Sequence, residues 1–150
     1  MPALLDGVAQ VPIGYNPWYI YTVNLVASPT AFTIYDVLFP DSSGNFDKLV
    51  TTDSVLTAGY AFACADYATG DTTAQVLAPG SLVAMIALTT TLTPFCLVKF
   101  SYSSPNQTAV IATATDLAAG KVIGRYMANL SNYVQISAAN DPIIVRSGVL

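Results

Sequence analysis

The side chains that most often carry out acid–base chemistry are missing from this sequence. It contains no histidine, and its nine acidic residues are all aspartate, without one glutamate. General acid–base catalysis near neutral pH commonly uses histidine, or a glutamate whose pKa is raised by burial. We therefore expect a protein that is not an enzyme.

Short motifs that could form a nucleotide or nucleophile site are incomplete. Residues 119–122, AGKV, resemble part of a phosphate-binding loop, but valine follows the lysine where serine or threonine is needed. Ser81 and Ser147 each adjoin a glycine, yet neither lies in the elbow motif of a serine hydrolase. No cofactor is expected.

Metal ligands with regular spacing are also missing. Cys64 and Cys96 are far apart along the chain and lie in apolar stretches, which favours buried thiols. A disulfide between them remains an alternative. Four aspartates lie in or beside expected turns, where the carboxylate bonds its local backbone, and none has the spacing of a calcium loop. They are Asp66, Asp71, Asp116 and Asp141.

The elements that would position any site are predicted to be short strands. β-branched and aromatic residues recur in short runs between turn-forming residues, which indicates an all-β, single-domain barrel or sandwich. No internal repeat is visible. Residues 59–67 and 72–78 stay open between short strands and a helical turn, and 40–45 are expected to be a surface loop. The predicted strands are 19–27, 31–39, 81–92, 95–102, 107–115, 121–128, 132–137 and 142–149.

An extended arm, residues 1–18, is predicted to precede the β-rich domain, residues 19–150. Proline lacks an amide donor and recurs along this segment, so a helix is not expected there. Pro12, Tyr15, Pro17 and Trp18 are the predicted partner-binding residues, since rigid rings around a turn are good anchors in a partner's pocket. The alternative is that these rings plug one end of a barrel.

The composition indicates a surface that partners or subunits cover. The chain is 53% hydrophobic and only 9% charged, against about 25% charged in a typical domain. Its five cations form no run, so we expect no binding to nucleic acid or to anionic lipid. No apolar stretch is long enough to cross a membrane, and the first residues do not resemble a secretion signal, so folding is expected where the chain is made.

The carboxy-terminal part, residues 108–150, resembles the head decoration (capsid cement) proteins of tailed phages of the lambda type. The similarity rests on the turn and strand 118–125 (AAGKVIGR), the strand 133–136 (YVQI), the turn 138–141 (AAND) and the closing 148–150 (GVL). It implies a homotrimer that binds the major capsid protein on the outer surface of an icosahedral capsid and stabilises the shell. The protein would then be part of the virion and be made in the host cytoplasm.

A second function class remains open from the residues alone. A carbohydrate-binding or adhesive β-sandwich would also be rich in tyrosine, of which the chain has nine, and would stack tyrosine and tryptophan on sugar rings. A rise in melting temperature with a particular sugar would favour this class.

Overall fold

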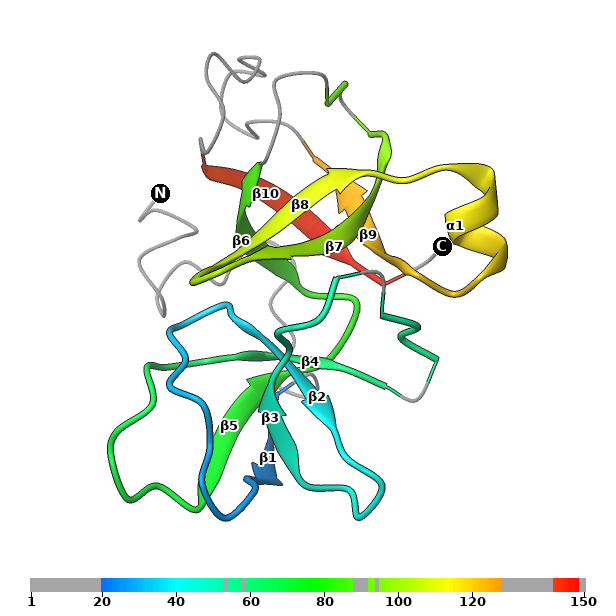
Figure 1. Cartoon of the computed structure of the whole chain (residues 1–150). Helices are drawn as coiled ribbons and strands as arrows, with labels where there is room; N and C mark the ends of the chain where they lie inside the picture. The colour runs from blue at the N-terminus through cyan, green and yellow to red at the C-terminus, as the bar shows by residue number, and fades with distance from the viewer. Residues whose placement is uncertain are drawn as a thin grey trace. The chain divides into compact units, whose positions relative to one another are not determined.

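The computed structural model confirms the all-β prediction (Figure 1). It describes residues 20–52, 54–57, 59–87, 92–93, 95–127 and 142–148. The strands are β1 (Ile20–Asn24), β2 (Val37–Pro40), β3 (Phe46–Lys48), β4 (Ala61–Ala63), β5 (Thr73–Leu77), β6 (Leu82–Ala87), β7 (Leu97–Ser103), β8 (Asn106–Ile111), β9 (Val122–Tyr126) and β10 (Pro142–Ser147). One short helix, α1 (Ala114–Ala118), lies between β8 and β9. Within the described ranges no helix has the length and apolar character needed to span a bilayer.

The strands gather in two compact units. Unit 1 comprises residues 1–49 and 58–81, and unit 2 comprises residues 50–57 and 82–150. Unit 1 holds a sheet of order β1-β5-β4-β2-β3 with antiparallel neighbours, whose ends are joined by one isolated parallel bridge between Leu25 and Phe46. Unit 2 holds a closed barrel of order β10-β6-β8-β7-β9. A closed ring with an odd number of strands must contain a parallel pair, and here this pair is β6 and β8.

Both units have the same strand arrangement, although the sequence shows no repeat. In each unit the first strand pairs with the fifth, the fifth with the fourth, the fourth with the second, and the second with the third, all antiparallel. In each, the first and third strands meet in parallel. The two units therefore share a topology that the sequence does not reveal as a repeat.

The correspondence extends to the pairing of individual residues. The Leu25–Phe46 bridge of unit 1 has the same place as the Ala87–Ala109 pair of unit 2. Because register and topology both agree, each position of one unit can be assigned to a position of the other. Residues that face one another across the second, fourth and fifth strands are Val37, Phe62 and Leu77 in unit 1, and Leu97, Arg125 and Arg146 in unit 2.

The segment that enters the second strand is also the same in both units. Tyr35 (φ 68°) and Phe95 (φ 67°) are the two non-glycine residues with positive φ in the described part of the chain. Each donates its backbone N–H to the last residue of the fourth strand, Tyr35 to the carbonyl of Ala63 at 2.8 Å and Phe95 to that of Tyr126 at 2.7 Å. This conformation is rare for an aromatic residue, so its presence at equivalent positions reflects a shared backbone path.

Each unit has its own apolar core. Alternate residues of a strand point to the same face, so the apolar side chains of neighbouring strands gather on the inner face of each unit. In β7, for example, Val98 and Phe100 are buried while Leu97 and Lys99 are half-buried. The cluster in unit 1 is Val23, Leu25, Phe32, Leu38, Ala61, Ala63 and Val76. The largest fully buried side chains of unit 2 are Tyr126, Ile123, Val83, Val98, Val122 and Val145.

Several predicted elements change in extent. The run 31–39 is a strand only from Val37, because the turn at Tyr35 precedes it. The predicted loop 40–45 is confirmed for residues 41–45, which join β2 to β3, while Pro40 belongs to β2. Strand β3 was not predicted. The run 107–115 ends as a strand at Ile111, and helix α1 follows, since Thr113 and Asp116 form a capping box. The segments 59–67 and 72–78 contain β4 and β5. The predicted strand 132–137 lies outside the described residues.

Candidate functional site

The predicted anchors Pro12, Tyr15, Pro17 and Trp18 lie outside the described residues. Their role in binding a partner therefore stays a prediction. The described part of unit 2 contains a different candidate site, which sequence reasoning did not find.

This site is a cavity of about 250 Å³ in unit 2, the arginine pocket, lined by Phe95, Arg125, Met127, Arg146 and Gly148. It combines two cations with two large apolar side chains. Such a combination suits an acidic group that is flanked by apolar atoms, because the guanidiniums bind a carboxylate and the apolar walls exclude water.

The pairing of β9 with β10 places the two arginines together. Arg125 and Arg146 are direct partners in the antiparallel register, so their side chains leave the sheet on the same face. Like charges directly opposite one another are destabilising. The pairing therefore concentrates two positive charges at one place on the barrel of unit 2.

Gly124, the residue before Arg125, allows this close pairing. A Cβ atom at Gly124 would overlap the carbonyl oxygen of Arg146 and would lie 2.9 Å from the Cα atom of Ser147. Glycine relieves crowding here, and at the turn before β9 Gly120 adopts φ 71°.

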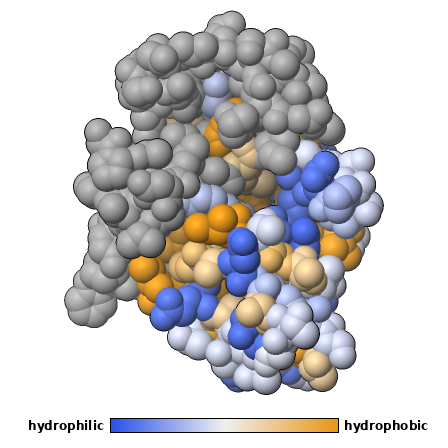
Figure 2. Space-filling model, turned by 90° about the vertical axis from the view of Figure 1, so that its left-hand side faces the viewer, coloured by the Kyte–Doolittle hydropathy of each residue, from blue (hydrophilic) through white to orange (hydrophobic). Residues whose placement is uncertain are grey.

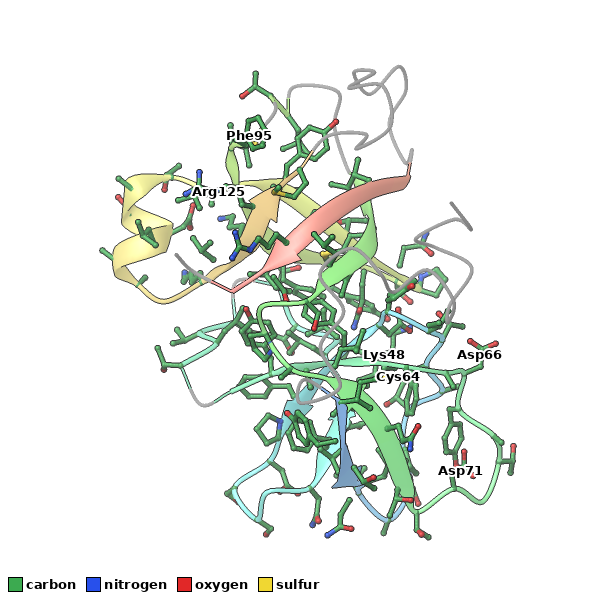
Figure 3. The ribbon with its side chains drawn as sticks, turned by 180° about the vertical axis from the view of Figure 1, so that it is seen from behind. Lys48, Cys64, Asp66, Asp71, Phe95 and Arg125 are labelled. Atoms are coloured by element: carbon green, nitrogen blue, oxygen red, sulfur yellow. The ribbon has the colours of Figure 1, made fainter. Side chains whose placement is uncertain are left out.

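Phe95 and Arg125 support each other at the rim of the arginine pocket (Figure 3). Nη1 of Arg125 donates a hydrogen bond of 2.6 Å to the carbonyl oxygen of Phe95. Phe95 is 49% exposed, although the side chain of phenylalanine gains about 1.5–3 kcal/mol from complete burial. The left-handed backbone of Phe95 thus presents an apolar ring beside a fixed guanidinium.

The equivalent positions of unit 1 carry different chemistry. Phe62 stands in the place of Arg125, and Leu77 in the place of Arg146. Phe62 is completely buried and Leu77 is half-buried. The two cations are therefore a property of unit 2 and not of the shared strand arrangement.

Two aspartates in the loop between β4 and β5 of unit 1 accept hydrogen bonds from backbone N–H groups (Figure 3). Asp66 Oδ1 accepts a 2.9 Å bond from the N–H of Ile34, and Asp71 Oδ2 accepts a 3.0 Å bond from that of Ala68. Both residues are exposed. The prediction that the carboxylate bonds its local backbone is confirmed for Asp71 and wrong for Asp66, whose donor Ile34 is 32 residues away in the sequence.

Asp116 has a structural role. Its carboxylate accepts bonds from the N–H and hydroxyl of Thr113 and lies 3.0 Å from Nζ of Lys99. The Thr113 backbone bond, together with Lys99 and the Thr113 hydroxyl, lowers its pKa to about 2. It is nearly buried, unlike the solvated turn aspartate expected, while Asp141 lies outside the described residues.

The thiols show no arrangement for redox chemistry or metal binding in the described part. Cys64 and Cys96 are both free and half-buried. Burial raises the pKa of each thiol, that of Cys64 to about 11, so the nucleophilic thiolate is disfavoured. Among the described residues no group of three histidine, cysteine or acidic side chains could hold a metal ion.

Apolar side chains also reach the surface outside the arginine pocket. Figure 2 shows one face of the described part, on which apolar side chains lie at the surface beside polar ones. Besides Phe95, the exposed large apolar residues include Tyr21, Val50, Val55, Ile111 and Leu117.

The arginine pocket had one signal in the sequence. Each of two predicted strands, 121–128 and 142–149, carries a single arginine close to a glycine. Their direct pairing depends on a register that the sequence does not specify. Comparison of the chain with models of protein families, with curated proteins and with solved structures found no match.

Proposed function

We propose that this chain is a virion structural protein that binds the outer surface of an icosahedral capsid and stabilises it. Its partners would be the major capsid protein and further copies of itself, as a homotrimer. The arm, residues 1–18, would contact the shell through Tyr15 and Trp18.

The observation that carries the proposal is the shortage of charge on a protein with exposed apolar side chains. Only 9% of the residues are charged, and Phe95, Val50 and Val55 are more than two-fifths exposed. Burial of apolar surface contributes about 25 cal/mol per Å², so a partner that covered these side chains would stabilise the chain.

Two further features agree with a structural role. The closed barrel of unit 2 leaves no free sheet edge among the described strands of that unit. The resemblance of residues 108–150 to capsid cement proteins spans the end of unit 2, including β9 and β10. Repetition over a capsid lattice would multiply modest contacts by avidity.

Deletion of residues 1–12 tests the arm. The shortened chain should keep its β-structure by circular dichroism and lose binding to shells assembled from the major capsid protein, measured by co-sedimentation. Removal of both anchor rings, Tyr15→Ser with Trp18→Ser, should weaken binding by about thirtyfold or more, since a buried anchor contributes about 2 kcal/mol or more.

A matched control for the ring removal is Tyr21→Ser, which removes an exposed aromatic side chain of β1. It should bind shells like the wild type. Unchanged binding by the shortened chain would remove the arm from the mechanism. A sugar-dependent rise in melting temperature without shell binding would favour the carbohydrate-binding alternative.

A further inference from the structure

The charges of this chain are unevenly divided between its two units. Unit 2 contains four of the five cations, Lys99, Lys121, Arg125 and Arg146, and three aspartates. Unit 1 contains six aspartates and Lys48. Nζ of Lys48 lies 3.1 Å from Oδ2 of Asp36 in an ion pair that is largely buried, so the exposed charges of unit 1 are negative in its described part.

We infer that the arginine pocket binds the β4–β5 loop of a second copy of this chain. This acidic loop, residues 64–72, would place Asp66 and Asp71 against Arg125 and Arg146 in a head-to-tail contact. The occupant follows from charge complementarity, because the chain itself carries two exposed carboxylates on one loop and two guanidiniums paired across two strands.

Groups on both sides of this contact are fixed before they meet. The guanidinium of Arg125 is held by the carbonyl of Phe95 at 2.6 Å. Each loop carboxylate uses one oxygen for a backbone N–H, at 2.9 Å for Asp66 and 3.0 Å for Asp71, and its other oxygen can accept from a guanidinium. Preorganised groups lose less conformational entropy on binding.

The contact also has an apolar part. Phe95 and Met127 line the arginine pocket, and the acidic loop presents the exposed methyl groups of Ala65 and Ala68. Ion pairs at a surface contribute little net affinity and mainly give specificity and salt dependence. Burial of the Phe95 ring would supply the apolar contribution.

The corresponding surface in unit 1 supports the use of this face for packing. Phe62 replaces Arg125 there, and it is fully buried, as is Val37 beside it. The same face of the shared strand arrangement is thus covered in unit 1, whereas in the described part of unit 2 it contains a cavity and an exposed ring.

A head-to-tail contact uses two different surfaces of each copy, so it generates closed rings or open chains. The inference does not depend on capsid binding, and the test uses this chain alone. The two proposals can therefore fail separately.

The first test measures the molar mass of the full chain by light scattering over a range of concentrations and salt. We expect self-association at low ionic strength that weakens by about tenfold or more between 0.01 and 1 M salt, since the screening length falls from about 30 Å to about 3 Å. A chain that is monomeric throughout, or an association indifferent to salt, would overturn the inference.

The second test uses two variants with complementary defects. Arg146→Glu removes the pocket's charge and keeps the acidic loop. Asp66→Asn with Asp71→Asn keeps the oxygens that accept the backbone bonds and removes the charge of the loop. Each variant alone should associate at least about tenfold more weakly than the wild type, and an equimolar mixture should form a 1:1 heterodimer and nothing larger.

Lys121→Gln is the matched control, since it removes one cation of unit 2 outside the arginine pocket and should leave association unchanged. Thermal unfolding verifies that each variant is folded, and Arg146→Gln replaces Arg146→Glu if the reversal prevents folding. Failure of the mixture to form a heterodimer, with both variants folded, would exclude the contact.

Discussion

Replacement of Gly124 by alanine tests how the barrel of unit 2 closes. The new Cβ atom would overlap the carbonyl oxygen of Arg146, and it would lie 2.8 Å from Cγ1 of Val145 and 2.9 Å from Cα of Ser147. Two of these three neighbours are backbone atoms. They can give way only if β9 and β10 move apart, and the two strands share three register pairs.

The expected cost follows from this crowding. Overpacking of a filled interior costs about 1–3 kcal/mol, and the upper end applies because a paired backbone yields less than a side chain. Glycine in a strand is itself destabilising by about 0.5–1 kcal/mol relative to alanine, which offsets part of the cost. We therefore expect Gly124→Ala to lower the free energy of unfolding by about 2 kcal/mol.

Urea unfolding measures the cost, and amide hydrogen exchange locates it. Protection should fall in β9 and β10 of the variant and remain in unit 1. Gly44→Ala is the control: Gly44 has φ +84°, and nothing lies within 4 Å of the position that an alanine Cβ would take there, so that change strains a torsion and crowds no neighbour. A variant at Gly124 within about 0.5 kcal/mol of the wild type, with protection unchanged, would refute the account of closure.

Two further predictions concern ionisation. The pKa of Asp116 is lowered to about 2. The contribution of this carboxylate to stability is therefore complete above its unfolded pKa and is lost as the pH falls from about 4 to 2. Asp116→Asn should flatten the dependence of melting temperature on pH in this range, and an unchanged slope would contradict the role of Lys99 and Thr113. Burial raises the pKa of Cys64 to about 11. In a Cys96→Ser variant, iodoacetamide at pH 8 should therefore alkylate Cys64 about a hundredfold more slowly than a peptide thiol. A rate within tenfold of the peptide thiol would show that Cys64 is not shielded by burial.

Strand patterning was the part of the fold that the sequence specified best. The predicted strand 95–102 contains β7, in which Val98 and Phe100 are buried and Leu97 and Lys99 are half-buried, as the alternation of a strand requires. Short elements were missed because three residues, as in β3, carry too little periodicity to be distinguished from a loop. Helix α1 was missed because its threonine and alanine run suits a strand equally well, and the capping box decides the outcome.

The candidate site depends on information that local patterns do not contain. Aromatic anchors can be identified from composition around a turn, but their surroundings depend on the partner. The Arg125–Arg146 pair arises from the register of two strands that are separated by residues 127–141. A shift of one residue would send one of the two side chains to the other face of the sheet.

The two units share a strand arrangement without a visible sequence repeat, because this arrangement constrains the side chains only loosely. A strand position requires only that its side chain suit the face on which it lies. The equivalent positions 76 and 145 are both buried and both valine. The equivalent positions 62 and 125 carry a phenylalanine in unit 1 and an arginine in unit 2. Backbone features are the same in both units because they set the path of the chain. Tyr35 and Phe95 have the same unusual φ. The residue after each of them donates its backbone N–H to a threonine carbonyl, Asp36 to Thr33 and Cys96 to Thr93. Residues of contrasting chemistry therefore occupy equivalent positions within one strand arrangement, as with Phe62 against Arg125 and Lys48 against Ile111.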